Sequence, residues 1–182
     1  MTKNGILCDN GTSRVSLDPK KSDFDGINFV SHAHMDHLPS KNGGTILSSI
    51  ETNEIAELRG FKMENHVKSL ENFSLIDSGH ILGAKGLLFD DIFYTGDICT
   101  RDRGFLLGAK IPKCKTLITE CTFGLSEFIF PKIDEIKKQV NELVSELYGK
   151  GIPVILMGYQ LGKAQTITQL FGHWGPLYLH DS

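Results

Sequence analysis

The sequence predicts an α/β protein, and two patterns in the chain support this prediction. Short apolar segments bounded by glycine, proline and aspartate recur through the first 124 residues, as is typical of β-strands. After Pro131 the apolar residues recur with the 3.6-residue period of an amphipathic helix. The helix–strand–helix–strand order that follows predicts a parallel α/β unit.

Composition sets broad limits on this protein. The 182 residues suffice for one sizeable core and the beginning of a second domain. No apolar run reaches the roughly eighteen residues of a membrane span, and the N-terminus lacks the apolar segment of a signal peptide. Four scattered cysteines predict reduced thiols, so we expect a cytoplasmic protein without membrane association. The net charge of −3 argues against a broad basic nucleic-acid footprint, although bound metal ions would neutralise nearby carboxylates.

The N-terminal half should be mostly strand. The sequence predicts a hairpin of strands 6–8 and 14–18 around Asn10-Gly11, and further strands at 27–31, 45–48 and 74–78. A short helix over 52–59 would be capped by Thr52 and ended by Gly60. Residues 61–73 lack a period, so we expect a loop with His66 on the surface.

The C-terminal half should alternate between strands and helices. Its predicted elements are a hairpin over 86–97 turning at Asp90-Asp91, a buried strand at 115–120, a helix at 133–147, a buried strand at 152–157, a helix ending near Phe171 and a strand at 176–180.

Four metal-ligand side chains fall within six residues at the end of the predicted strand 27–31. His32, His34, Asp36 and His37 form the pattern H-x-H-x-D-H. Imidazole and carboxylate ligands suit zinc and similar divalent ions. One ion rarely takes four ligands from so short a run, so we expect two pairs serving two ions. A histidine-rich surface turn without metal is the alternative.

This pattern after an apolar strand resembles the signature of the metallo-β-lactamase fold, an αββα sandwich with its metal site at one sheet edge. The resemblance implies that Asp18 orients a ligand histidine without touching the metal, although Asp18-Pro19 is also a plain turn signal. It further implies that His80, in the pattern S-G-H-x-x-G, binds the first ion. Asp97, in T-G-D, would bridge both ions, with a capping aspartate as the alternative.

A further motif resembles the β-CASP branch of this superfamily, whose members cleave RNA or DNA. Glu120-Cys-Thr-Phe-Gly124 resembles its acidic motif, and Leu161 to Gln165 resembles its L-G-K-A-Q element. The resemblance implies a metallo-β-lactamase core over 1–124 and the N-terminal part of a β-CASP domain over 125–182. The two later histidine motifs of the branch lie outside this sequence, and we do not assign His180 to either role. We therefore expect an incomplete sandwich.

These motifs together predict a two-zinc nuclease that hydrolyses phosphodiester bonds in RNA processing or degradation. His32, His34 and His80 would bind the first zinc, Asp36 and His37 the second, and Asp97 both. The catalytic carboxylates would be Asp36, Asp97 and Glu120, with Asp18 and Glu120 orienting ligands from outside the metal shell. Phosphate contacts could come from Arg101, Arg103 and Lys163, whose alternative role is as a solvated surface.

Several alternatives stay open at this point. RNA is favoured over DNA as the nucleic-acid partner, yet a DNA exonuclease of the same branch fits the same motifs. A non-catalytic nucleic-acid-binding subunit would keep the fold without cleavage. A homo-oligomer or a partner chain could complete the site. A thioesterase-type hydrolase is the weakest alternative, because enzymes of that kind lack the motif at Glu120.

Overall fold

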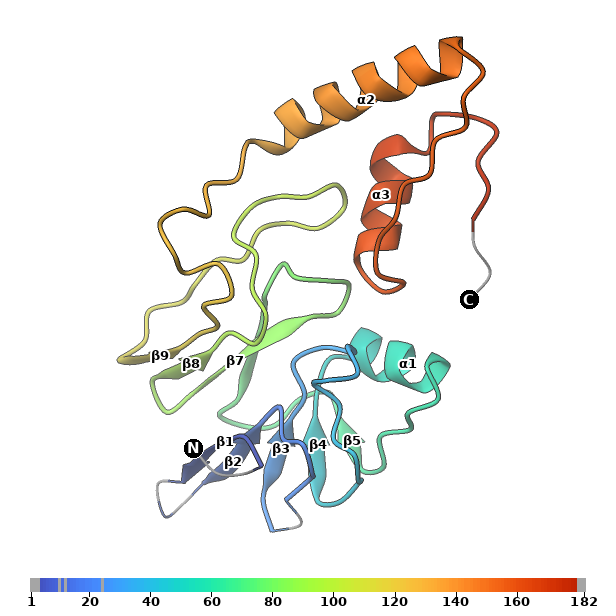
Figure 1. The fold of residues 1–182 in the computed structure, drawn as a ribbon. Coiled ribbons are helices and arrows are strands. Elements are labelled where there is room, and N and C mark those ends of the chain that lie inside the picture. Colours follow the sequence, from blue (N-terminus) through green and yellow to red (C-terminus); the bar gives the residue numbers. More distant parts are fainter. Residues whose placement is uncertain (1–3, 10, 12, 24, 180–182) are drawn as a thin grey trace. The chain divides into compact units, whose positions relative to one another are not determined.

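The computed structural model describes residues 4–9, 11, 13–23 and 25–179, which form two compact units (Figure 1). Unit 1 contains the described residues up to Asp102 together with Leu106–Glu120. Unit 2 contains Arg103–Phe105 and the described residues from Cys121 onward. The assignment of 1–124 and 125–182 to two named domains stays a prediction.

Among the described residues of unit 1, five strands form a mixed sheet in the order β1-β2-β3-β4-β5. Its strands are β1 (Ile6–Asp9), β2 (Arg14–Leu17), β3 (Ile27–Phe29), β4 (Thr45–Leu47) and β5 (His66–Val67). β1 and β2 are antiparallel and the later pairs are parallel. This confirms the predicted hairpin. The Gly11 amide of its turn donates to Asp9 Oδ1 (3.0 Å), whereas Asn10 lies outside the described residues.

A second sheet follows in the order β6-β7-β8-β9. Its strands are β6 (Ser74–Asp77), β7 (Lys85–Phe89), β8 (Ile92–Tyr94) and β9 (Thr116–Ile118). The predicted turn between β7 and β8 is confirmed, because Asp90 and Asp91 have φ values of 45° and 61°, as a two-residue hairpin requires. The predicted burial of the strand at 115–120 is wrong. β9 is an edge strand on which Thr116 and Leu117 are exposed and only Ile118 packs against the core. The apolar sequence could not show whether another layer covers this strand.

The two sheets of unit 1 face each other across one apolar core (Figure 1). The first sheet contributes Val15, Leu17, Phe29 and Leu47, and the second contributes Leu87, Phe89 and Tyr94. The rings of Phe29 and Tyr94 meet edge to face with centroids 6.1 Å apart. Burial of one such side chain stabilises the fold by roughly 1.5–3 kcal/mol. Unit 1 is thus an α/β structure with two mixed sheets, consistent with a metallo-β-lactamase-type fold.

Helix α1 (Ile50–Leu58) starts two residues before the predicted position. Its N-cap is Ser49, whose Oγ accepts a hydrogen bond from the Thr52 amide (3.0 Å), so the prediction of Thr52 as the cap is wrong. Ser49 and Thr52 are both good capping residues, and sequence alone did not separate them. His66 also differs from its prediction. It lies in β5, half-buried, with Nε2 3.2 Å from the Ser48 carbonyl oxygen.

Unit 2 contains the two predicted helices, α2 (Ile133–Gly149) and α3 (Lys163–Phe171). The strand predicted at 152–157 is absent, and Ile155 is 82% exposed. Residues 176–179 are likewise not a strand, and His180 lies outside the described residues. An extended apolar segment becomes a strand only when a neighbour pairs with its backbone. The described part of unit 2 supplies no such neighbour, so the predicted parallel α/β unit is wrong for these residues.

The longest helix in the described part of the chain is α2, with 17 residues and many charged side chains. Within these described residues, no helix combines the length and the apolar character that crossing a membrane requires.

Candidate metal centre

The first two histidines lie on a tight turn that leaves β3. The Val30 amide donates to the Leu47 carbonyl (3.0 Å), so the pairing with β4 continues one residue past β3. Beyond it, the His37 amide donates to the His34 carbonyl (3.0 Å) and closes the turn. The turn therefore projects His32 and His34 from the edge of the first sheet.

His80 and Asp97 come from the second sheet, on the loops that follow β6 and β8. The two loops are in direct contact, since the Cys99 amide donates to the Ser78 carbonyl (2.9 Å). Gly79, with a φ of 67°, permits this contact, because a Cβ there would lie 2.4 Å from the Cys99 carbonyl oxygen. A glycine at this position is what allows the two backbones to approach so closely.

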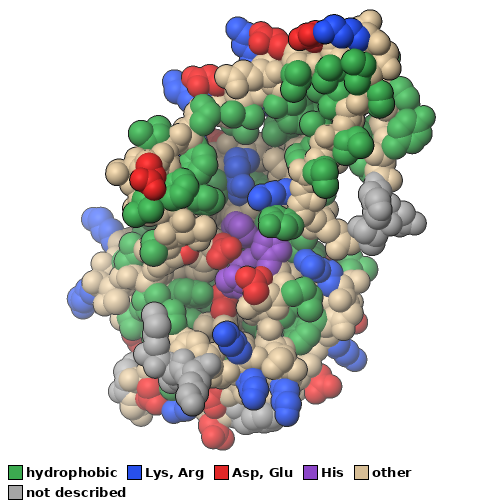
Figure 2. All heavy atoms as spheres, in the orientation of Figure 1, with side chains coloured by type: hydrophobic (Ala, Val, Ile, Leu, Met, Phe, Trp, Pro, Cys, Tyr) green, Lys and Arg blue, Asp and Glu red, His purple; other side chains and the backbone are tan. Residues whose placement is uncertain are grey.

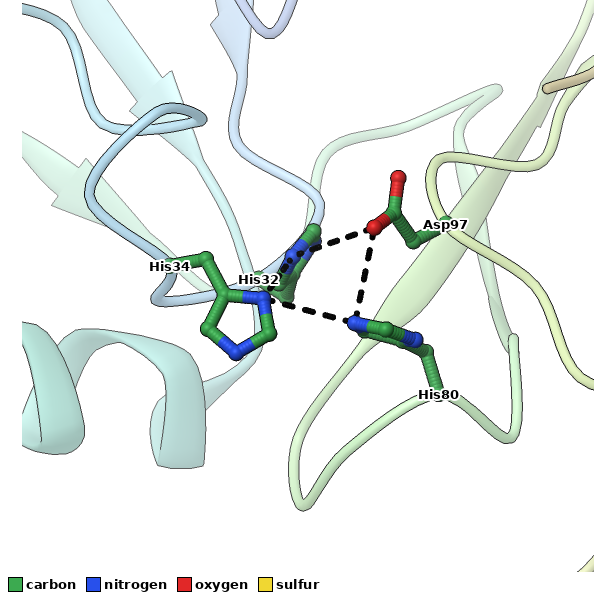
Figure 3. A group of neighbouring side chains, drawn as sticks. All are labelled: His32, His34, His80 and Asp97. Atoms are coloured by element: carbon green, nitrogen blue, oxygen red, sulfur yellow. Dashed lines mark hydrogen bonds and ion pairs between the residues drawn. The ribbon is translucent and has the colours of Figure 1, made fainter. Parts of the chain in front are cut away.

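Four side chains converge at this edge (Figure 3), where histidine and acidic side chains gather on the surface (Figure 2). One ligand atom from each of His32, His34, His80 and Asp97 lies within 4.8 Å of all the others. His34 Nδ1 is 2.9 Å from His32 Nε2 and 3.3 Å from His80 Nε2. Asp97 Oδ2 is 3.5 Å from His80 Nε2 and 3.9 Å from His32 Nε2. The structure thus brings together three predicted ligands of the first ion and the predicted bridging carboxylate.

The donor set fits a divalent cation. Burial, together with the neighbouring histidines, lowers the pKa of His32 far below its ordinary value, so its ring is neutral. Ser31 Oγ donates to Asp18 Oδ2 (2.6 Å) and therefore accepts from His32 Nδ1 (2.9 Å). That leaves the Nε2 lone pair of His32 directed at the cluster. Three imidazoles and one carboxylate around a common point are a typical zinc ligand set.

A second group, formed by His37 and Asp36, lies on the side of the other oxygen of Asp97. Asp97 Oδ1 is 3.5 Å from His37 Nε2, which in turn is 3.8 Å from Asp36 Oδ2. Asp36 lies outside the tight cluster of four, and its side chain is 81% exposed. The two oxygens of Asp97 therefore face different histidine groups. Burial raises the pKa of Asp97, and neighbouring carboxylates add to this while His37 opposes it.

Asp18 is the hydrogen-bonding centre behind this second group. Its carboxylate accepts from the Ser31 amide (2.7 Å), Ser31 Oγ (2.6 Å), His37 Nδ1 (2.8 Å) and Tyr94 Oη (2.8 Å). Because His37 Nδ1 donates to Asp18, the Nε2 lone pair is free to face Asp97. Burial lowers the pKa of His37, but the bond to Asp18 and the nearby carboxylates outweigh it and raise the pKa.

Sequence reasoning missed the two side chains that hold Asp18 in place, Ser31 and Tyr94. Ser31 directly precedes the histidine run, where a small polar residue carries little signal. Tyr94 ends β8, and its ring packs in the core while its hydroxyl reaches Asp18. A tyrosine among apolar strand residues indicates a buried hydroxyl that needs a partner, but not which partner.

The remaining predicted site residues are not part of the cluster formed by His32, His34, His80 and Asp97. Glu120 Oε1 accepts from the Ile98 amide (2.8 Å), so this carboxylate fixes the backbone next to Asp97. Arg101 follows on the same loop of unit 1. Arg103 and Lys163 belong to unit 2, where Lys163 Nζ lies 4.7 Å above the Tyr159 ring. Phosphate binding by these three basic residues stays a prediction.

Comparison with known proteins relates this chain to a group of nucleases. No family model matches the sequence. Over 94% of the present chain, the sequence is 26% identical to the RNase J-like protein of Methanocaldococcus jannaschii. Over 54% of the present chain, it is 28% identical to Endoribonuclease YSH1 of Gibberella zeae. The chain is a relative of the β-CASP metallo-β-lactamase nucleases.

Another relative of the chain carries a different kind of name. Over 76% of its length the chain is 28% identical to a protein of Opitutus terrae named Probable DNA ligase. The chain spans 50% of the RNase J-like protein, 15% of the ligase and 12% of the endoribonuclease. It therefore corresponds to half or less of these relatives.

Proposed function

We propose that this chain binds two zinc ions and hydrolyses phosphodiester bonds in RNA. The observation that carries the proposal is the orientation of Asp97, whose Oδ2 faces His32 and His80 while Oδ1 faces His37. A carboxylate with imidazole nitrogens on both sides is suited to hold two cations a short distance apart. Paired cations are a recurring solution for phosphodiester cleavage.

In this proposal the protein contributes the position of each ligand. His32, His34 and His80 hold the first ion, Asp36 and His37 hold the second, and Asp97 contacts both. Bound zinc supplies Lewis acidity toward phosphate oxygens and lowers the pKa of coordinated water.

Three neighbours keep those ligands in place in the described structure. Asp18 orients His37 and Ser31 orients His32 by the hydrogen bonds given above. Glu120 holds the loop of Asp97 through the Ile98 amide. The catalytic role expected for Glu120 thus becomes, in this proposal, the positioning of Asp97.

RNA is the proposed substrate because two relatives carry the names RNase J-like protein and Endoribonuclease. DNA is the second candidate, favoured by the similarity to a protein named Probable DNA ligase over most of the chain. Both polymers present the same phosphodiester to the metals. The choice between them therefore depends on contacts outside the metal centre.

Cleavage of end-labelled single-stranded RNA and DNA of matched sequence tests the proposal. The zinc-loaded chain should cleave RNA, and Asp97→Asn should lose zinc and at least about a hundredfold in rate, because one neutral oxygen replaces a bridging carboxylate. Asp25→Asn is the matched control, since this exposed carboxylate precedes β3, at the opposite end of the strand from the histidines. Wild-type activity in Asp97→Asn would refute the mechanism. Preferential cleavage of DNA would show that DNA, not RNA, is the substrate.

A further inference from the structure

The N-terminus of α1 is bonded to the loop that carries His80. Ser49 Oγ and Thr52 Oγ1 both donate to the carbonyl oxygen of Gly83, at 2.6 and 3.0 Å. Both hydroxyl-bearing residues are buried, and Thr52 has no exposed surface. A carbonyl that accepts two buried hydroxyl groups is held more tightly than the helix cap itself requires. Capping the helix needs only the bond from the Thr52 amide to Ser49 Oγ.

The loop that carries His80 is short and closed by backbone hydrogen bonds, so Gly83 and His80 belong to one compact turn. The Ser78 amide donates to the Ala84 carbonyl (3.1 Å), and the Ala84 amide donates to the Ile81 carbonyl (3.1 Å). Gly83 has a φ of 78°, and a Cβ there would lie 2.7 Å from Glu51 Cβ. This glycine therefore lets the loop lie directly on the first turn of α1.

The other end of α1 reaches the turn that carries the remaining histidines. Arg59, which follows the helix, donates from Nη1 to the Ala33 carbonyl at 3.4 Å. Ala33 is buried and lies between His32 and His34. One helix thus contacts both ligand-bearing segments, which the two sheets contribute separately.

We propose that Ser49 and Thr52 are positioning residues of the metal centre, which set the place of His80 relative to His34. The inference rests on the proposed function, in which His80 is a metal ligand. His80 Nε2 lies 3.3 Å from His34 Nδ1, and a shift of the loop that carries His80 would move these two nitrogens apart. Groups that orient metal ligands from outside the shell typically contribute a factor of about 10–100 to metal affinity.

Zinc titration against a chromophoric chelator tests this role without relying on nuclease activity. Thr52→Val keeps the side-chain shape and removes one bond to Gly83, so zinc affinity should fall about tenfold. Ser49→Ala should also weaken zinc binding. Thr52→Ser, which retains the hydroxyl, should bind zinc nearly as well as the wild-type chain. Thr116→Val on the exposed edge strand β9 is the matched control and should not change the affinity.

A double-mutant cycle with His80 separates positioning from general stability. If Thr52 acts through His80, Thr52→Val should add no further loss of zinc affinity in a His80→Ala background. An equal loss in both backgrounds, or wild-type affinity in Thr52→Val, would overturn the inference. Failure of the wild-type chain to bind zinc would instead overturn the proposed metal site. Should Thr52→Val fail to fold by circular dichroism, Ser49→Ala and the Thr52→Ser rescue still decide the question.

Discussion

Removal of the Tyr94 hydroxyl tests the hydrogen-bonding centre at Asp18. In Tyr94→Phe the ring keeps its edge-to-face contact with Phe29, so the apolar contribution to stability is unchanged. The variant loses only the 2.8 Å bond from Tyr94 Oη to Asp18, one of the four that this carboxylate accepts. A hydrogen bond to a charged group contributes about 1.5–3 kcal/mol. We therefore expect a loss of about 2 kcal/mol in the free energy of unfolding.

Urea denaturation of the zinc-free protein, followed by circular dichroism, measures this loss. With a denaturant slope of about 2 kcal/mol/M, the unfolding midpoint should fall by about 1 M. Tyr178→Phe removes an equivalent hydroxyl from an exposed ring, so its midpoint should match that of the wild type. Equal midpoints for the two variants would mean that the bond to Asp18 contributes no stability, and our account of Asp18 would be wrong.

Three other perturbations have defined outcomes. The hydrogen bond from Arg14 lowers the pKa of Asp23 below its ordinary value. The stabilisation of the fold by this pair is therefore complete above about pH 4 and is lost as the pH falls through the pKa of Asp23 in the folded protein. Asp23→Asn should therefore lower the urea midpoint at pH 7, and the midpoints of the variant and the wild type should converge in strong acid. A difference between the two midpoints that does not change with pH would contradict the pairing of Asp23 with Arg14. Leu47→Ala should cost about 2–5 kcal/mol by calorimetry, against almost nothing for the exposed Leu58→Ala. Zinc at a hundredfold excess over its dissociation constant should stabilise the fold by about 2.7 kcal/mol, and chelation should reverse the resulting shift in melting temperature.

The turns that carry the proposed ligands of the first ion, and the strands before these turns, could be predicted from sequence because both depend on local pattern. His32 and His34 follow an apolar strand, and Gly79 and Gly96 mark the turns that precede His80 and Asp97. The turn at Asp90-Asp91 likewise follows from residues that tolerate positive φ. Turns and strand ends of this kind can be predicted from neighbouring residues alone, without knowledge of what packs against the sheet.

Features that depend on distant partners could not be predicted. The bond from Tyr94 to Asp18 joins residues 76 positions apart. The contact of Thr52 with Gly83 spans 31 positions. No spacing rule selects such pairs, because they follow from how the two sheets and α1 pack. The same reasoning explains why the strand predicted at 152–157 is absent, since a strand forms only where a neighbour elsewhere in the fold pairs with it.

The open segment 152–157 has a practical consequence for handling this protein. These six consecutive residues carry no charge and are exposed at Ile155 and Met157, so they offer apolar side chains and an unpaired strand-like segment to a second molecule. Concentrated solutions should therefore aggregate through this segment. Pro153 limits the process, because it lacks the amide that a growing sheet would use. Replacement of Ile155 by lysine would add a charge at an accessible position and extend the useful concentration range.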